Sequence, residues 1–140
     1  MSEEEKMQAI MSQMKLYEAY LNDILARENT ITRLREEGRL AIEAIKDISG
    51  QEVVQTLMPI GIGVFMQTSA SSSNKLLISI GAGVAVEKSK DDAVAYIESR
   101  LKEMEVAVRS MMSQKQEIVT RMEQMRAELN AMLQKMQRTG

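Results

Sequence analysis

The sequence predicts an α+β protein in which two long helices form an antiparallel coiled coil and are linked by two β-hairpins. Charged residues concentrate in residues 1–48 and 90–140 and are scarce in between. Apolar residues in both flanking segments recur at alternating intervals of three and four, the spacing of helices that pair along one stripe. Residues 49–89 are instead rich in β-branched residues and hold most of the glycines and the only proline, which favours short strands and turns.

The composition excludes several classes of protein. The 140 residues include no Cys and no His, so a disulfide framework, a thiol nucleophile, an imidazole base and the usual zinc sites are ruled out. A net charge of -2 offers no attraction for nucleic acid or for an acidic membrane surface. We therefore expect a single domain with no metal, no cofactor and no nucleic-acid partner.

Two features argue against a membrane protein. The longest apolar run, residues 57–66, is interrupted by Pro59 and is shorter than the roughly 20 residues that span a bilayer. The first residues, Ser2 to Glu5, are acidic and do not resemble a signal peptide. The absence of Cys is compatible with a reducing compartment, so we expect a cytoplasmic protein without membrane contact.

The C-terminal segment, residues 90–140, has the clearest periodicity. Its stripe is apolar over about six heptads and is interrupted only by Lys115. The apolar members are Val94, Ile97, Leu101, Met104, Val108, Met111, Ile118, Met122, Met125, Leu129, Met132 and Met136. This pattern predicts one long coiled-coil helix.

The N-terminal segment, residues 1–48, repeats the pattern with irregularities. Glu28 occupies a stripe position, and the phase slips after Ile31. The apolar stripe otherwise comprises Met7, Ile10, Met14, Tyr17, Leu21, Ile24, Ile31, Leu34, Ala41, Ile45 and Ile48, with Gly38 among them. Because glycine in a helix interior costs about 1 kcal/mol relative to alanine, we expect a local weakness or bend at Gly38.

End signals delimit both helices. Ser2 and Glu5 have the spacing of a capping box, and Ser89 with Asp92 has the same spacing at the second helix. Gly50 follows the first helix as a typical C-terminal stop. Two helices of similar length and opposite direction predict a hairpin within one chain, and pairing between chains is the alternative.

The polar stripe residues Glu28 and Lys115 should face each other in such a hairpin. They form either a pair that fixes the helix register or two long side chains that reach separately to water. Of these two interpretations we favour the second.

Residues 49–89 predict four strands in two hairpins. Residues 53–58 and 64–68 form the first pair, residues 76–80 and 84–88 the second, and residues 59–63 act as breakers. The Gly-x-Gly motifs at residues 61–63 and 81–83 lack the further Gly or Lys of a phosphate loop, so we interpret them as turns. Hairpins this apolar leave unpaired edges, which predicts closure into an oligomeric β-barrel.

The methionines suggest a second apolar surface. Met is flexible and packs adaptably, so it specifies a coiled-coil core poorly and suits a surface that holds varied partners. Many of the thirteen Met residues lie near the two chain ends, at the tip of the predicted coiled coil. A client-binding tip and ordinary core packing both remain open.

Three segments resemble the α-class subunit of prefoldin, of the archaeal type. Residues 57–65 (LMPIGIGVF) resemble the segment between the family's first strands, and residues 80–88 (IGAGVAVEK) the segment that enters its second helix. Asp91-Asp92-Ala93 followed by Ile97 resembles the start of that helix. The resemblance covers essentially residues 1–140, as one subunit with a helix (1–48), an assembly platform (49–89) and a second helix (90–140).

The resemblance implies an ATP-independent holdase, not an enzyme, and therefore no catalytic residues. Its partners would be β-class prefoldin subunits in a hetero-hexamer of two α and four β chains, non-native client proteins, and a group II chaperonin. The implied subunit-assembly residues are Val54, Leu57, Ile60, Val64, Phe65, Leu76, Ile78, Ile80, Val84 and Val86. The implied client-binding residues are Met7, Ile10, Met11, Met14, Met122, Met125, Leu129, Met132 and Met136.

A structural protein is the alternative function. Coiled-coil helices on a self-pairing β platform could form a scaffold or filament that binds no client. Leu and Ile would be expected throughout the stripe of such a rod, so the abundance of Met favours the chaperone.

Overall fold

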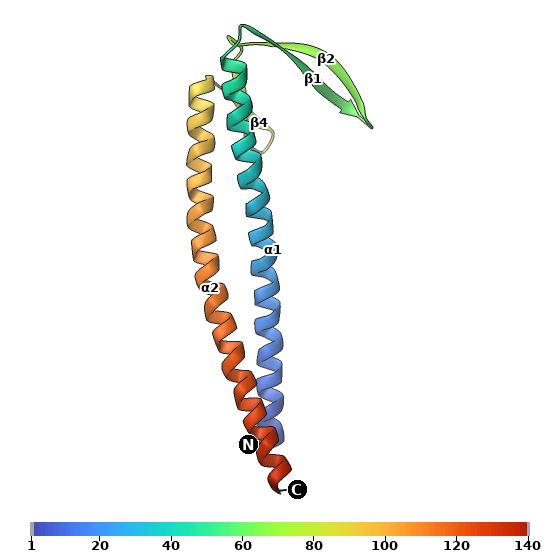
Figure 1. The fold of residues 1–140 in the computed structure, drawn as a ribbon, viewed down its shortest axis with the longest axis vertical. Coiled ribbons are helices and arrows are strands. Elements are labelled where there is room, and N and C mark those ends of the chain that lie inside the picture. Colours follow the sequence, from blue (N-terminus) through green and yellow to red (C-terminus); the bar gives the residue numbers. More distant parts are fainter. Residues whose placement is uncertain (1, 140) are drawn as a thin grey trace. The chain divides into compact units, whose positions relative to one another are not determined.

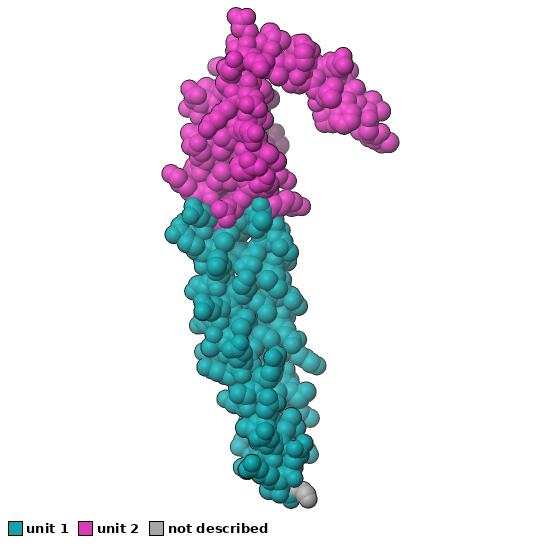
Figure 2. All heavy atoms as spheres, in the orientation of Figure 1, with its two compact units in different colours: residues 1–32, 105–140 teal, residues 33–104 magenta. Residues whose placement is uncertain are grey.

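The computed structural model describes residues 2–139 and contains two helices with four strands between them (Figure 1). The elements in chain order are α1 (Glu3–Ser49), β1 (Val53–Gly61), β2 (Val64–Ser71), β3 (Leu76–Gly81), β4 (Val84–Lys88) and α2 (Lys90–Thr139). The chain forms two compact units, coloured in Figure 2. Unit 1 comprises residues 1–32 and 105–140, and unit 2 comprises residues 33–104. The α+β class with two hairpins is confirmed.

The helix ends follow the predicted capping chemistry. The Glu5 amide donates to Ser2 Oγ (3.2 Å) and the Ser2 amide donates to the Glu5 carboxylate (3.4 Å), which completes the capping box. At the start of α2 the Asp92 amide donates to Ser89 Oγ (3.1 Å). The Gly50 amide donates to the Lys46 carbonyl (3.2 Å) at the end of α1. Local hydrogen bonds therefore determine where each helix begins or ends.

Unit 1 is an antiparallel pair of helical segments held by one apolar seam. Ile24 is buried, with only 7% of its surface exposed. The other seam side chains of unit 1 are half-buried and follow the predicted three-four spacing. They are Met7, Ile10, Met14, Tyr17, Leu21, Glu28 and Ile31 on α1, and Val108, Met111, Lys115, Ile118, Met122, Met125, Leu129 and Met132 on α2. A two-helix seam buries one stripe of each helix and leaves the remaining faces in water.

In the helical part of unit 2, α1 and α2 lie close together at Gly38, and Ala93 of α2 is buried. A Cβ atom at position 38 would lie 2.8 Å from Leu101 Cδ2 and 3.4 Å from Ile97 Cγ2. α1 is continuous through Gly38, so the helix is not interrupted there, and the local weakness or bend stays a prediction. The glycine allows close approach of α2. Leu34, a predicted stripe residue, is 37% exposed and therefore lies outside the buried part of the seam.

Each hairpin of unit 2 is a separate two-stranded antiparallel sheet. In the first, Val54 pairs with Ala70, Thr56 with Thr68, and Met58 with Met66. In the second, Ile78 pairs with Val86 and Leu76 with Lys88. The hydroxyls of Thr56 and Thr68 lie 2.6 Å apart, so their cross-strand hydrogen bond supports the first register.

The first hairpin is longer than predicted. β1 continues through Pro59, which pairs with Phe65, and β2 continues to Ser71. Residues 59 and 60 are therefore part of a strand, which corrects their interpretation as breakers. Proline is tolerated here because a two-stranded sheet consists only of edge strands, and the register also shifts just beyond it, between Pro59 and Gly61.

Both tight turns use left-handed backbone conformations. In the first turn Ile62 and Gly63 have φ values of 49° and 76°, and in the second Ala82 and Gly83 have φ values of 52° and 75°. Positive φ at two central residues is the requirement of a type I′ hairpin turn, and glycine satisfies it without steric cost. The interpretation of these Gly-x-Gly motifs as turns is confirmed.

Candidate assembly and client-binding surfaces

The hairpins carry most of the large apolar side chains that are exposed in unit 2. Leu57 is 62% exposed and Phe65 is 56% exposed. Ile60, Val64, Ile80 and Val84 are also more than half exposed, whereas Val54, Leu76, Ile78 and Val86 are half-buried. The ten predicted assembly residues therefore all lie on the two sheets. We refer to the ten together as the hairpin surface.

Both faces of the first hairpin are apolar towards its turn. The register places Leu57, Pro59 and Phe65 on one face and Met58 with Met66 on the other. Contiguous exposed apolar area of this kind, next to unpaired strand edges, is typical of protein interfaces. Sequence reasoning missed five further exposed residues of the two hairpins: Val53, Met58, Ile62 and Met66 in the first, and Leu77 in the second. Because successive side chains of a strand point to opposite faces, this alternation would have identified Met58 and Met66 as residues of the second face.

The nine predicted client-binding residues all belong to unit 1, on α1 and α2. They lie between residues 7 and 14 and between residues 122 and 136, which we call the Met-rich end. Met11 is 50% exposed and Met136 is 40% exposed. The other seven are half-buried in the seam, so each contributes to packing and still presents part of its surface.

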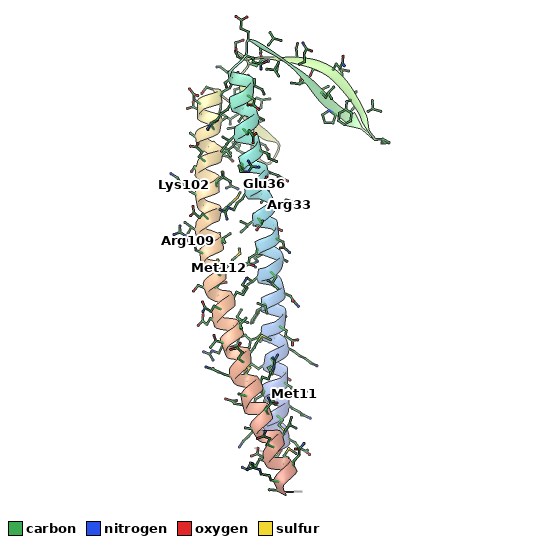
Figure 3. The ribbon with its side chains drawn as sticks, in the orientation of Figure 1. Met11, Arg33, Glu36, Lys102, Arg109 and Met112 are labelled. Carbon is green, nitrogen blue, oxygen red and sulfur yellow. The ribbon has the colours of Figure 1, made fainter. Side chains whose placement is uncertain are left out.

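Further exposed apolar residues of unit 1 lie outside the predicted set. They are Leu16, Tyr20, Leu25, Val106, Met112, Val119 and Leu133, and Figure 3 labels Met11 and Met112. Leu25, Met112 and Val119 line a shallow groove of about 550 Å³ together with Lys115. These positions flank the seam, so a search restricted to stripe positions could not find them.

An aromatic hollow of about 420 Å³ lies beside the seam of unit 1. Tyr17 and Tyr20 line it with their ring centroids 6.3 Å apart and their planes at 76°, an edge-to-face arrangement. Asp23 and Arg27 also line it and form an ion pair of 3.0 Å on the helix surface. The hollow thus combines an apolar floor with a charged rim.

The two polar stripe residues contact each other. Lys115 Nζ donates to Glu28 Oε2 at 3.2 Å, and the two side chains are 36% and 18% exposed. The second carboxylate oxygen, Glu28 Oε1, is buried and has no hydrogen-bond partner among the described residues. The favoured interpretation, in which both side chains reach separately to water, is therefore wrong. Their contact instead supports the register pair.

These features define a class of protein: a coiled-coil subunit with apolar hairpins. Residues 17–135 match the prefoldin subunit family. The prefoldin subunit alpha of Nitrosopumilus maritimus is 42% identical over 98% of this chain and 94% of its own length. That of Archaeoglobus fulgidus is 27% identical over 96% and 99%. The chain therefore belongs to the prefoldin family, which confirms the resemblance to archaeal α-class subunits and the role of a chaperone subunit.

Solved prefoldin structures share the fold. The prefoldin beta subunit from Thermococcus strain KS-1 superimposes with a TM-score of 0.60 at 15% identity, covering 90% of each chain. A filamentous prefoldin from Methanocaldococcus jannaschii gives a TM-score of 0.56 at 19% identity, covering 89% of this chain and 98% of the other. The prefoldin family is one of chaperones and is not known for catalysis. Within residues 2–139, neither helix holds a stretch that is apolar and long enough to cross a membrane.

Proposed function

We propose that this chain is the α-class subunit of an ATP-independent, cytoplasmic holdase. The hairpin surface joins β-class subunits in a hetero-hexamer of two α and four β chains, whose strands close into a β-barrel. The Met-rich end binds non-native proteins, which the complex passes to a group II chaperonin. Residues 1–48, 49–89 and 90–140 act as helix, platform and helix of one subunit.

The observation that carries this proposal is the presence of two different kinds of apolar surface, one in each unit. The hairpin surface consists mainly of β-branched residues, with two Leu and one Phe, on hydrogen-bonded strands, which suits a defined interface. The Met-rich end consists mainly of flexible Met side chains, with Ile10 and Leu129, that are partly packed and partly exposed, which suits varied clients. Several such ends in one complex would bind by avidity, without a shaped pocket.

The test is suppression of aggregation of a denatured model protein, followed by light scattering, with this chain assembled on its β-class partner. We expect suppression by the wild type and weaker suppression when Met11 and Met136 are both changed to Ser. The matched control is Met112→Ser, an exposed Met outside the Met-rich end. Assembly of every variant is verified by size-exclusion chromatography.

Two results would contradict the proposal. If the assembled wild type does not suppress aggregation, the holdase function is wrong. If Met112→Ser is as damaging as the change at the Met-rich end, the location of the client site is wrong.

A filament or scaffold subunit is the second candidate. The related prefoldin from Methanocaldococcus jannaschii is described as filamentous, and an exposed two-sided sheet is compatible with open-ended association. Electron microscopy of the purified chain distinguishes the two, because a filament would grow with concentration whereas a hetero-hexamer is closed.

A further inference from the structure

Lys90 contacts the connection between the two hairpins, all within unit 2. Its ammonium group donates to the carbonyl oxygens of Ser71 (3.4 Å), Ser72 and Asn74 (3.2 Å). A lysine ammonium has three donors, so three carbonyls match its capacity. The side chain is half-buried, and among the described residues every ion pair is formed by other side chains. This contact is therefore made to backbone alone.

The position of Lys90 is electrostatically unfavourable for the helix that begins with it. A helix N-terminus carries partial positive charge and favours acidic residues, as at Asp91 and Asp92. A cation in this first turn therefore opposes the helix dipole. The three carbonyl oxygens compensate, because a hydrogen bond from a charged donor is stronger than one between neutral groups.

The amides of the same connection are already paired locally. The Ser72 amide donates to the Glu52 carbonyl (3.0 Å) and the Asn74 amide donates to the Ser71 carbonyl (3.0 Å). The hydroxyls of Ser71 and Ser73 lie 2.8 Å apart. These bonds shape the turn so that three carbonyl oxygens converge on one ammonium group.

We propose that Lys90 is a positioning residue whose charge holds the inter-hairpin connection against the start of α2. This contact determines where the second hairpin leaves the first, and thereby the arrangement of the hairpin surface. The importance of this arrangement for assembly rests on the proposed function. Neutralisation of Lys90, for example by acetylation, would release residues 71–74 and weaken assembly with β-class subunits.

The test uses the absence of cysteine from the whole sequence. Lys90→Cys introduces one thiol. Alkylation with 2-bromoethylamine restores a lysine-like ammonium, whereas alkylation with iodoacetamide leaves a neutral amide at the same place. Both adducts come from one purified variant, so a folding defect of the substitution affects them equally. Lys75→Cys, adjacent to the same connection, receives both treatments as the matched control.

Hydrogen exchange of peptides covering residues 70–76 is the primary measurement. We expect the neutral adduct at position 90 to exchange about tenfold faster than the wild type at Ser72 and Asn74, because charged hydrogen bonds are lost. The aminoethyl adduct should exchange at the wild-type rate, and both adducts at position 75 should behave alike. Equal exchange in the two adducts at position 90, whether slow or fast, would overturn the proposal.

Assembly is measured separately, by titrating each adduct with the β-class subunit. We expect about tenfold weaker association for the neutral adduct only. Faster exchange with unchanged association would refute the role of Lys90 in assembly. If the wild type does not associate with the β-class subunit, the proposed function fails, whereas the exchange result still decides whether Lys90 holds the connection.

Discussion

At position 38, the space available for a side chain is limited by a neighbouring residue across the seam. The missing side chain of Gly38 leaves room for Leu101, whose Cδ2 would be 2.8 Å from a Cβ atom. A contact this short requires a shift of the Leu101 side chain, which opposes the higher helix propensity of alanine. In Gly38→Ala, the steric cost at Leu101 lowers the free energy of unfolding and the higher helix propensity of alanine raises it, and we expect the two contributions to be of similar size.

A double-mutant cycle tests this balance. Gly38→Ala should change the free energy of unfolding by less than about 0.5 kcal/mol in the wild type. In a Leu101→Ala background the clash is absent, so the same change should stabilise by about 1 kcal/mol. Urea unfolding followed by circular dichroism at 222 nm gives both values. If Gly38→Ala has the same effect in both backgrounds, Leu101 does not oppose a side chain at position 38.

The Glu28–Lys115 pair gives a second prediction at the residue scale. Lys115→Met leaves a half-buried carboxylate without its donor and should destabilise the chain by about 1–3 kcal/mol. Replacing both residues, by Glu28→Leu with Lys115→Met, should restore most of the loss, because no charge is then left unpaired. The measurement is again urea unfolding.

The exposed pair Asp23–Arg27 is the control for this prediction. Arg27→Gln should cost less than about 1 kcal/mol, because surface ion pairs contribute little. If Lys115→Met is no more damaging than Arg27→Gln, the seam pair does not contribute to stability.

At the scale of elements, α1 carries a cluster of exposed charges on its outer face. Arg39 donates to Glu36 at 2.6 and 3.1 Å and to Glu43 at 3.5 Å. Its hydrogen bonds, and secondarily its positive charge, hold the pKa of Glu36 below the ordinary value of 4.5. The reciprocal interaction raises the pKa of Arg39. Pairs at this spacing support a helix that has water on most sides.

The pH dependence of this pair follows from the lowered pKa of Glu36. Its stabilising contribution is fully present above pH 4.5 and is lost as the pH falls through the lower pKa of the folded state. In an NMR titration, Arg39→Gln should raise the pKa of Glu36 towards 4.5. Arg33→Gln, on the same helix (Figure 3), should leave it unchanged. An unchanged Glu36 pKa in Arg39→Gln would refute the assigned cause.

The strands differ from the helices in what stabilises them. Each sheet has only two strands, and such hairpins are marginal in water without further cover. The I′ turns and the Thr56–Thr68 hydrogen bond support the register locally. The side chains of Leu57 and Phe65 are more than half exposed, so their burial within the chain contributes little to the stability of the hairpin. The hairpins are therefore the elements whose stability should depend most on a partner.

At the scale of the whole molecule, the dependence of the hairpins on a partner predicts that a single substitution can prevent assembly without unfolding the helices. Leu57→Glu should leave the helical circular dichroism of the chain unchanged, because the side chain is largely exposed and packs little. The same change should abolish or strongly weaken assembly with β-class subunits, because a charge would be buried in the interface. Analytical ultracentrifugation of the mixture measures this.

Leu16→Glu is the matched control, since Leu16 is an equally apolar, exposed residue of α1 outside the hairpins. It should assemble like the wild type. Assembly by Leu57→Glu at wild-type affinity would show that the hairpin surface is not the interface.

Features that depend on local chemistry follow from the amino-acid sequence alone. The helix ends at Ser2, Gly50 and Ser89, the seam periodicity and the two hairpins follow from caps, heptads and glycine turns, each contained in a few neighbouring residues. The central segments also indicated the family, because their turn and strand residues are distinctive whereas coiled-coil periodicity is shared by many proteins.

Features that depend on contacts with a facing chain segment could not be predicted from the sequence and are visible only in the folded chain. The glycine at position 38 is explained by Leu101, which lies against it from α2, and Pro59 is accommodated because β1 is an edge strand. In the sequence, Lys90 is a charged residue beside two aspartates, with no local pattern that indicates a role. Its role depends on three carbonyl oxygens some 16 to 19 residues earlier in the chain, a convergence that only the folded backbone creates.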